Sequence, residues 1–218
     1  MREALALALD PEAIFEAVAQ GQGEMTSQTF ALDSTGFVEA LDEEYDYDPE
    51  RAEELLEEAG AADLSVELPI STTFDPAIYD SVQQNWEDVG ITVERHQWGP
   101  GEAIPAMQGG DHELAYMQLA ARDSWRHINF LLTPDAPWNP METQSDELDD
   151  LVSTAKEGDE TEQAEAAQAI NQYVVDEYWF IPVLRPMNLF YWNDNVEVEN
   201  QFMNDVPYLY NYSPSDES

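Results

Sequence analysis

Residues 119–130, which read LAARDSWRHINF, gather scarce cationic side chains into one short stretch. Arg122, Arg126 and His127 lie close together there, although the whole chain has only 7 Lys and Arg and 3 His against 47 Asp and Glu. Arg126 offers a planar guanidinium that can bind a carboxylate or a phosphate through two parallel hydrogen bonds. The stretch therefore predicts either the floor of a site for an anionic or polyhydroxylated ligand, with Trp125 as an apolar wall, or an ion-pair cluster that only braces a loop.

Three further side chains extend this candidate site. Asp123 could pair with Arg126 and brace the loop, or it could itself recognise a cation. Trp98 and Trp138 lie at a predicted strand end and in a predicted loop, where aromatic rings can form pocket walls as well as core. The candidate ligand-binding residues are Asp123, Trp125, Arg126, His127, Arg122, Trp98 and Trp138.

The sequence contains few features that indicate catalysis or metal binding. The chain has no Cys and no G-x-S-x-G, H-E-x-x-H, P-loop or G-x-G-x-x-G motif. His96, His112 and His127 are far apart in sequence, so we expect surface or hydrogen-bonding roles for them. The acidic run at 41–48, LDEEYDYD, lacks the glycine and the spacing of an EF-hand loop. We expect no catalytic residues, no cofactor and no metal.

The net charge of -40 is extreme, and Lys156 is the one lysine. Such a chain has no basic patch for phosphate groups, so we expect no nucleic-acid partner. Spread-out acids with almost no lysine indicate a halophile's protein, because in molar salt the Debye length falls to roughly 3 Å and self-repulsion is screened. Apolar residues make up 43%, enough for a core, and no run approaches the roughly 20 apolar residues that span a bilayer.

Three strands are predicted, at 64–70, 91–98 and 113–120. The first two are separated by a helix that FDPAIYDSVQQNWEDVG predicts, and the last two by a short interrupted helix or a turn in GEAIPAMQGG. This alternation is typical of a parallel sheet with βαβ units, in which ligands bind beyond the carboxyl ends of the strands. The cationic stretch directly follows the third predicted strand.

The remaining segments are predicted from capping and turn residues. One helix is expected at 2–19, with Asp10-Pro11 as a cap and first-turn signal partway along, and a loop at 20–47. YDPERAEELLEEAG has an Asp cap, a Pro at the first helical position and a Gly stop. Further helices are expected near 126–132, 146–157 and 160–178, and a strand pair broken by prolines in FIPVLRPMNLFYW at 180–192.

Four segments occur in an order that resembles a known family. REALALALDPEAIFEAV, YDPERAEELLEEAG, NWEDVGITVERHQWGP and MQGGDHELAYMQLAARDSWRHINFLL together resemble the C-terminal half of the family 5 solute-binding proteins. These are the dipeptide- and oligopeptide-binding components of ABC importers. The resemblance covers nearly the whole chain.

The resemblance implies an α/β fold: a periplasmic-binding-protein-like lobe of the class II, cluster C type, truncated at the N-terminus. Residues 1–180 would form the second large lobe, and 181–218 would form C-terminal strands and a tail that return towards a missing first lobe. A signal peptide, a lipid-attachment cysteine and that first lobe would precede Met1. We would then expect an extracellular, surface-anchored monomer that works with ABC permease subunits in the membrane.

The family carries solute contacts in a pattern like GW-x-x-D-x-x-DP-x-NF, through which its peptide-binding members hold the peptide's α-amino group. Matching NFL at 129–131 places Asp123 on the first acidic position and Arg126 on the second. Arg126 therefore reverses the charge of an acidic position, and Leu119 and Ala120 replace the Gly-Trp pair. An arginine cannot pair with an ammonium group, which argues against the usual mode of peptide binding.

These observations predict a non-catalytic protein that binds a peptide-like or other small polar solute between two lobes and delivers it to a permease. Two alternatives stay open at this point. One is a hydrolase that uses carboxylates on a halophilic scaffold, although no nucleophile–base pair stands out. The other is a truncated copy that binds no solute, because a single lobe contains only half a cleft.

Overall fold

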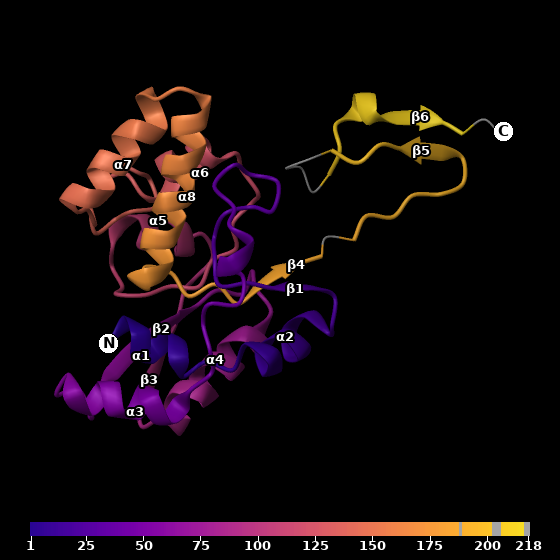
Figure 1. Cartoon of the computed structure of the whole chain (residues 1–218). Helices are drawn as coiled ribbons and strands as arrows, with labels where there is room; N and C mark the ends of the chain where they lie inside the picture. The colour runs from indigo at the N-terminus through magenta and orange to yellow at the C-terminus, as the bar shows by residue number, and fades with distance from the viewer. Residues whose placement is uncertain (188, 202–205, 216–218) are drawn as a thin grey trace.

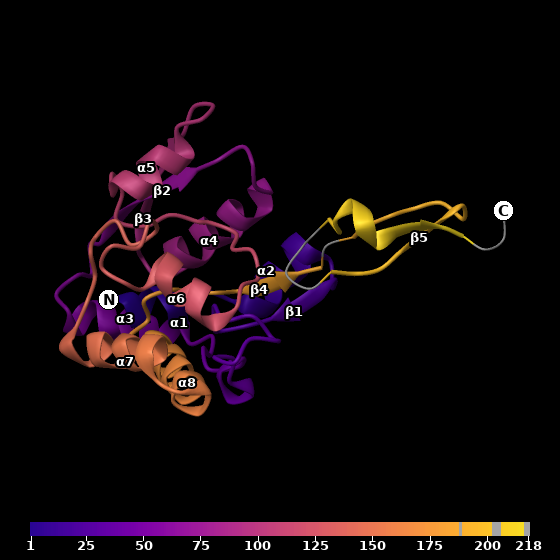
Figure 2. The same ribbon diagram turned by 90° about the horizontal axis from the view of Figure 1, so that it is seen from above.

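The computed structural model describes residues 1–187, 189–201 and 206–215, which form a body and a narrow C-terminal arm (Figures 1 and 2). The first part of the body contains helices α1 (Arg2–Leu7), α2 (Pro11–Ala19), α3 (Pro49–Glu58) and α4 (Pro76–Asp88) around strands β2 (Ser65–Ile70) and β3 (Thr92–Gln97). Within the described residues, no helix is long and apolar enough to cross a membrane.

Strands β2 and β3 form the parallel pair that the sequence predicts, joined through α4. Their register runs from Ser65 opposite Thr92 to Ile70 opposite Gln97. Val66 and Leu68 are buried, and they pack into a core cluster with residues of α1, α3 and α4. The Trp86 indole of α4 donates to the Leu5 carbonyl at 3.0 Å, which ties α4 to α1.

The prediction of a third strand at 113–120 is wrong, because residues 114–120 join no ladder and each sheet in the described residues has two strands. The alternation in this segment is nevertheless used for packing. Leu114 and Tyr116 pack against the first core cluster, and the Tyr116 ring meets the rings of Phe74 and Tyr79 edge-on. The segment thus follows the sheet's side-chain pattern without its backbone hydrogen bonds.

The single helix predicted at 2–19 is two helices. The break falls at Asp10-Pro11, where the Asp10 carboxylate accepts from the backbone N–H of Ala13 at 2.9 Å and Pro11 begins α2. The Asp10 backbone N–H donates to the Asn85 side chain at 3.0 Å, so the new helix start is fastened to α4. An N-cap residue has a non-helical backbone conformation. A capping residue in the middle of a helical sequence pattern therefore divides the predicted helix into two.

The second part of the body is helical, with α6 (Ser124–Leu131), α7 (Asp146–Glu157) and α8 (Glu160–Asp176) packed around a second apolar cluster. The helices predicted at 146–157 and 160–178 are confirmed within two residues. Asp159 and Glu162 form a capping box at the start of α8. Phe30, from the loop predicted at 20–47, inserts into this cluster and is 1% exposed.

The loop predicted at 20–47 also contains β1 (Gly23–Met25) and a 3-10 turn, η1 (Glu39–Leu41). Strand β1 pairs antiparallel with β4 (Leu184–Pro186), so the strand signal at 180–192 finds its partner near the other end of the chain. Asn188 of that segment lies outside the described residues. The short helix α5 (Ala103–Gly109) follows β3.

The C-terminal arm is built on a hairpin of β5 (Val196–Val198) and β6 (Tyr212–Pro214), with the turn η2 (Leu209–Asn211) beside it. Both views show this hairpin away from the body (Figures 1 and 2). Many of its apolar side chains are exposed, among them Tyr191, Leu209 and Tyr210.

The Asp42 carboxylate joins several of these segments. Its Oδ2 accepts from Arg185 Nη1 at 3.0 Å, and its Oδ1 accepts from Arg185 Nη2 at 2.6 Å, from Thr26 at 2.8 Å and from Gln28 at 2.9 Å. Burial raises the pKa of Asp42, but the hydrogen bonds from Arg185, Thr26 and Gln28 outweigh burial and lower that pKa below its ordinary value.

Replacing Asp42 with Asn should destabilise the fold, because the Arg185 side chain, 20% exposed, would lose its counter-charge. We expect a loss of about 1–3 kcal/mol, less than for a fully buried pair because both side chains retain some contact with water. Chemical unfolding at constant salt measures it. Asp46→Asn makes the same change in net charge at an exposed position and should leave stability almost unchanged; equal effects of the two variants would contradict a special role for Asp42.

The Asp42 contribution should also depend on pH. Because its pKa is lower in the folded state than the roughly 3.9 of an unfolded Asp, the stabilisation is fully present above about pH 4. It is lost as pH falls through the folded-state pKa. The stability difference between wild type and Asp42→Asn should therefore be constant from pH 8 to pH 5 and shrink in stronger acid, which unfolding curves at a series of pH values would show.

Candidate functional site

The predicted cationic stretch leads into the N-terminus of α6. Asp123 is the N-cap residue: its Oδ1 accepts from the Arg126 backbone N–H at 3.0 Å, and its Oδ2 lies 3.2 Å from Arg126 Nε. The Arg126 side chain is 78% exposed and that of Asp123 is 50% exposed, so water screens this ion pair. The pair braces the start of the helix while most of the guanidinium stays accessible.

The other face of α6 is fastened to the loop that follows β1. The Ser124 hydroxyl accepts from the backbone N–H of Gly36 at 2.7 Å and lies 2.9 Å from the Thr35 hydroxyl. His127 is 3% exposed, with Nε2 2.9 Å from the Thr29 hydroxyl.

His127 is thus a core residue rather than a surface side chain. Its ring packs against Phe30 at 4.5 Å between centroids. Burial, and secondarily the positive charge of Arg122, lower the pKa of His127 to about 4, so the ring is neutral at neutral pH. The expectation that His127 faces a solute finds no support in this position, because the side chain presents almost no surface.

Arg122 and Trp138 both contact the Phe130 ring. The Arg122 guanidinium carbon is 3.9 Å from the centroid of the Phe130 ring, a cation–π arrangement, and its Nη1 donates to the Ala120 carbonyl at 3.0 Å. Trp138 packs against the same Phe130 ring, with centroids 5.8 Å apart. Both predicted residues are partly buried, so each has a packing role as well as some exposed surface.

Two of the predicted residues line a small hollow beside α6, which we call the α6 hollow. Its volume is about 190 Å³, below the range of about 300–1,000 Å³ that is usual for small-molecule sites. The residues that line it are Thr35, Asp123, Ser124, Trp125, Ile128, Ala155, Gln163 and Ala167. The structure therefore brings Asp123 and Trp125 together, with Arg126 attached through its ion pair.

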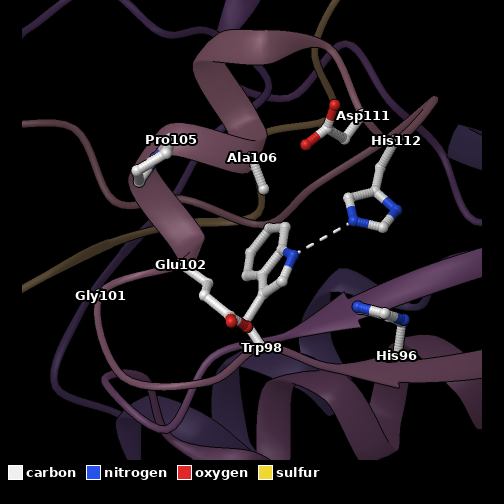
Figure 3. A pocket seen from close by; sticks show the side chains of 8 residues that line it. All are labelled: His96, Trp98, Gly101, Glu102, Pro105, Ala106, Asp111 and His112. Atoms are coloured by element: carbon white, nitrogen blue, oxygen red, sulfur yellow. Dashed lines mark hydrogen bonds between the residues drawn. The ribbon is translucent and has the colours of Figure 1, made fainter.

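Trp98 lies at a different place, in a hollow at the carboxyl end of β3 (Figure 3). This β3 hollow has a volume of about 340 Å³ and shares no lining residue with the α6 hollow. It is lined by His96, Trp98, Gly101, Glu102, Pro105, Ala106, Asp111 and His112. The indole is only 4% exposed, so Trp98 supports the wall of the hollow more than it presents a free face.

The sequence interpretation did not select Glu67 and His112, which form a chain of contacts with Trp98 beside the β3 hollow. His112 Nδ1 lies 2.6 Å from Glu67 Oε1, and its Nε2 lies 3.1 Å from the Trp98 indole nitrogen. The expectation that His112 makes hydrogen bonds is confirmed. The alternation of LSVELPI, which puts Glu67 on the strand face opposite Val66 and Leu68, is the one signal that could have drawn attention to it. In the described part of the chain, no group of three or more His, Asp or Glu could hold a metal ion.

Solved structures share this fold. The chain superposes on HbpA2 from Haemophilus parasuis with a TM-score of 0.81 at 20% identity, covering 98% of this chain and 44% of that one. It superposes on a dipeptide binding protein from a Pseudoalteromonas species, solved in complex with Met-Leu, with a TM-score of 0.79 at 18% identity, covering 98% and 45% of the two chains.

Sequence comparison agrees with the fold. The di/tripeptide-binding protein 1 of Pseudomonas aeruginosa is 29% identical over 120 residues, which cover 52% of this chain and 22% of that protein. The chain thus spans less than half of the length of each of these relatives. Residues 1–141 match the family described as bacterial extracellular solute-binding proteins, family 5 middle. The chain belongs to the family 5 extracellular solute-binding proteins.

Proposed function

We propose that this chain forms one lobe of the solute-binding component of an ABC importer. The protein would capture a peptide-like or other small polar solute between two lobes and deliver it to permease subunits without chemical turnover. The family match over residues 1–141 is the observation that carries this proposal. Two-lobed binding proteins close on a hinge, and the free energy for closure comes from contacts that form only in the closed state.

The exposed start of α6 is the proposed place of solute contact on this lobe. Arg126 is the most accessible cation there, and its guanidinium suits a carboxylate or another anionic group of the solute. Trp125 and Asp123 line the α6 hollow beside it, while Arg122 and Trp138 each contact the Phe130 ring. Trp98 would contribute through the separate β3 hollow.

The division into a lobe at 1–180 and a returning segment at 181–218 belongs to the same proposal. Tyr191, Leu209 and Tyr210 of the arm are 82%, 89% and 77% exposed, more than expected for large apolar side chains without a covering partner. A first lobe would cover them, and a lipid-anchored segment before it would hold a monomeric protein at the outer cell surface.

A habitat of molar salt is proposed from the charge. The net charge of -40 must be screened for the chain to remain compact, and the arginines that form ion pairs do so mainly at exposed positions. Exposed pairs contribute little stability, so they cannot offset the general repulsion among carboxylates.

In the complete protein, Arg126→Ala should abolish most of the thermal stabilisation by solute. Loss of a charge-assisted hydrogen bond costs about 1.5–3 kcal/mol, which corresponds to roughly 10- to 150-fold weaker binding. A thermal-shift screen in high salt with dipeptides, sugars and organic acids measures it. Arg51→Ala, at a half-exposed arginine of α3 that also pairs with acids, is the matched control; unchanged affinity in Arg126→Ala would remove Arg126 from the site.

The variant Asp123→Ser distinguishes two roles of Arg126: direct contact with the solute, and an ion pair with Asp123 that only stabilises the start of α6. Serine keeps the helix cap but removes the carboxylate that pairs with Arg126. If Arg126 binds the solute, Asp123→Ser should retain the solute-induced shift that Arg126→Ala loses. Equal loss of the shift in both variants would mean that the solute needs the Asp123 carboxylate as well, either as a direct contact or as the partner that holds Arg126 in place.

Arg126→Asp restores an acid at the position where the family pattern has one. We expect the preference to move towards solutes with a free amine, because a carboxylate at the start of α6 would pair with an ammonium group. Competition binding between a dipeptide and its N-acetylated form measures this preference. An unchanged ratio would show that the charge at 126 does not set solute selection.

Lowering the salt from molar to millimolar concentration should unfold the chain, because the Debye length grows from about 3 Å to more than 30 Å and carboxylate repulsion is no longer screened. Circular dichroism measures the loss of helix. Sucrose in place of salt is the control, since it favours burial but does not screen charge. A fold that persists in millimolar salt would contradict the halophilic origin.

A further inference from the structure

Three side chains beside the β2–β3 sheet form one continuous chain of polar contacts. Glu67 comes from β2, Trp98 directly follows β3, and His112 lies in the loop after α5. His112 contacts both of the others: its Nδ1 lies 2.6 Å from Glu67 Oε1, and its Nε2 lies 3.1 Å from the Trp98 indole nitrogen. Figure 3 shows the contact between His112 and Trp98. The His112 side chain is 11% exposed and Trp98 is 4% exposed, whereas Glu67 is 47% exposed and reaches water.

The indole of Trp98 determines which nitrogen of His112 carries the proton. An indole N–H can only donate, so His112 Nε2 must accept and therefore has a free lone pair. The proton of the neutral ring is then on Nδ1, where it faces the Glu67 carboxylate. Both ring nitrogens are satisfied in this tautomer and in no other neutral form.

The charged and titratable groups around His112 come from several elements. His96 of β3 has its ring 5.0 Å from the His112 ring, and Asp111 is the preceding residue in the loop. Glu102, at the start of α5, lines the same hollow, with its carboxylate accepting from the Gly99 backbone N–H at 2.7 Å. Arg95 of β3 instead contacts Asp80 and Gln83 of α4. The imidazole thus contacts the Glu67 carboxylate and the ring of a second histidine, while Asp111 and Glu102 line the same hollow.

We propose that His112 is a proton-sensitive positioning residue, which holds Trp98 in the wall of the β3 hollow only while Nε2 is unprotonated. A proton taken up from water binds the Nε2 lone pair, and the acceptor becomes an N–H donor that faces the indole N–H. Two donors cannot form a hydrogen bond, while the contact between Nδ1–H and Glu67 becomes an ion pair. Trp98 then has a buried donor without an acceptor, which is costly, and the wall of the hollow rearranges.

The switch needs only the gain or loss of one proton on the imidazole, a change that histidine side chains undergo in proteins. Its consequence for solute capture rests on the proposed function, because only then does the β3 hollow belong to a solute-binding cleft. The coupling between His112 and Trp98 does not depend on that function and can be measured on the chain without solute.

Nuclear magnetic resonance on the chain at constant high salt tests the coupling. At pH 8, long-range nitrogen–proton spectra of the His112 ring should show a proton on Nδ1 and none on Nε2. As the pH is lowered to 5, the indole N–H resonance of Trp98 should move with the same midpoint as the His112 ring resonances. A proton on Nε2 at pH 8, or a Trp98 resonance that stays still while His112 titrates, would overturn the proposal.

Two variants complete the test. His112→Gln places a neutral amide oxygen where Nε2 was, so Trp98 can keep an acceptor that does not titrate, and its indole resonance should then be independent of pH. His96→Gln removes the neighbouring histidine, which is outside the hydrogen-bonded chain, and should leave the Trp98 titration in place. The opposite pattern, with His96 rather than His112 controlling the resonance, would refute the assignment. The wild-type titration decides the matter even if a variant fails to fold, and none of these outcomes depends on solute binding.

Discussion

The Asp42 carboxylate is the constraint on which the arrangement of the body depends. It binds Arg185, 143 positions later in the chain, and thereby holds β4 beside β1. Through Gln28 the same network continues to Asn171 of α8, whose side-chain amide donates to Gln28 Oε1 at 2.6 Å. One charged group thus connects the β1–β4 pair to the helical cluster, and because the network is largely buried, each of its members depends on the others for a partner.

Local features of the fold could be predicted because their causes are local. Caps such as Asp48, Asp75 and Asp159 lie within three residues of the N–H groups they satisfy, so the helix starts at 49, 76 and 160 follow from short motifs. The prediction of a strand at 113–120 was wrong because strand pairing is not a local property. Alternation specifies which side chains face the core, but a strand also needs a neighbouring backbone edge, and a short sequence pattern contains no information about that edge. The pairing of β1 with β4 likewise joins segments about 160 positions apart.

The same distinction applies to the candidate site. Asp123 and Arg126 are three positions apart on one helix, so their pairing could be anticipated, and their exposure leaves solute contact open to experiment. The contact of His127 with Thr29 agrees with the expectation of a surface or hydrogen-bonding role. Its burial could not be predicted, because it is produced by the loop that carries Thr29 and Phe30, about 98 positions earlier. Glu67, Trp98 and His112 come together only through the parallel register of β2 and β3 and the path of the loop after α5. None of the three stands out in the sequence, because the role proposed for them depends on contacts that form only in the folded chain.

The exposed rings of the C-terminal arm have a consequence for the colloidal behaviour of this chain. Carboxylate repulsion keeps separate copies apart in dilute buffer, and it acts over the whole surface. Concentrated salt removes that long-range barrier and at the same time strengthens the tendency of apolar surface to leave water. Concentrated salt therefore favours adhesion between the arms of neighbouring molecules, through side chains such as Leu209 and Tyr210. The charge of the chain and the apolar surface of its arm therefore respond in opposite ways to ionic strength, and a low protein concentration limits contact between the arms of separate molecules.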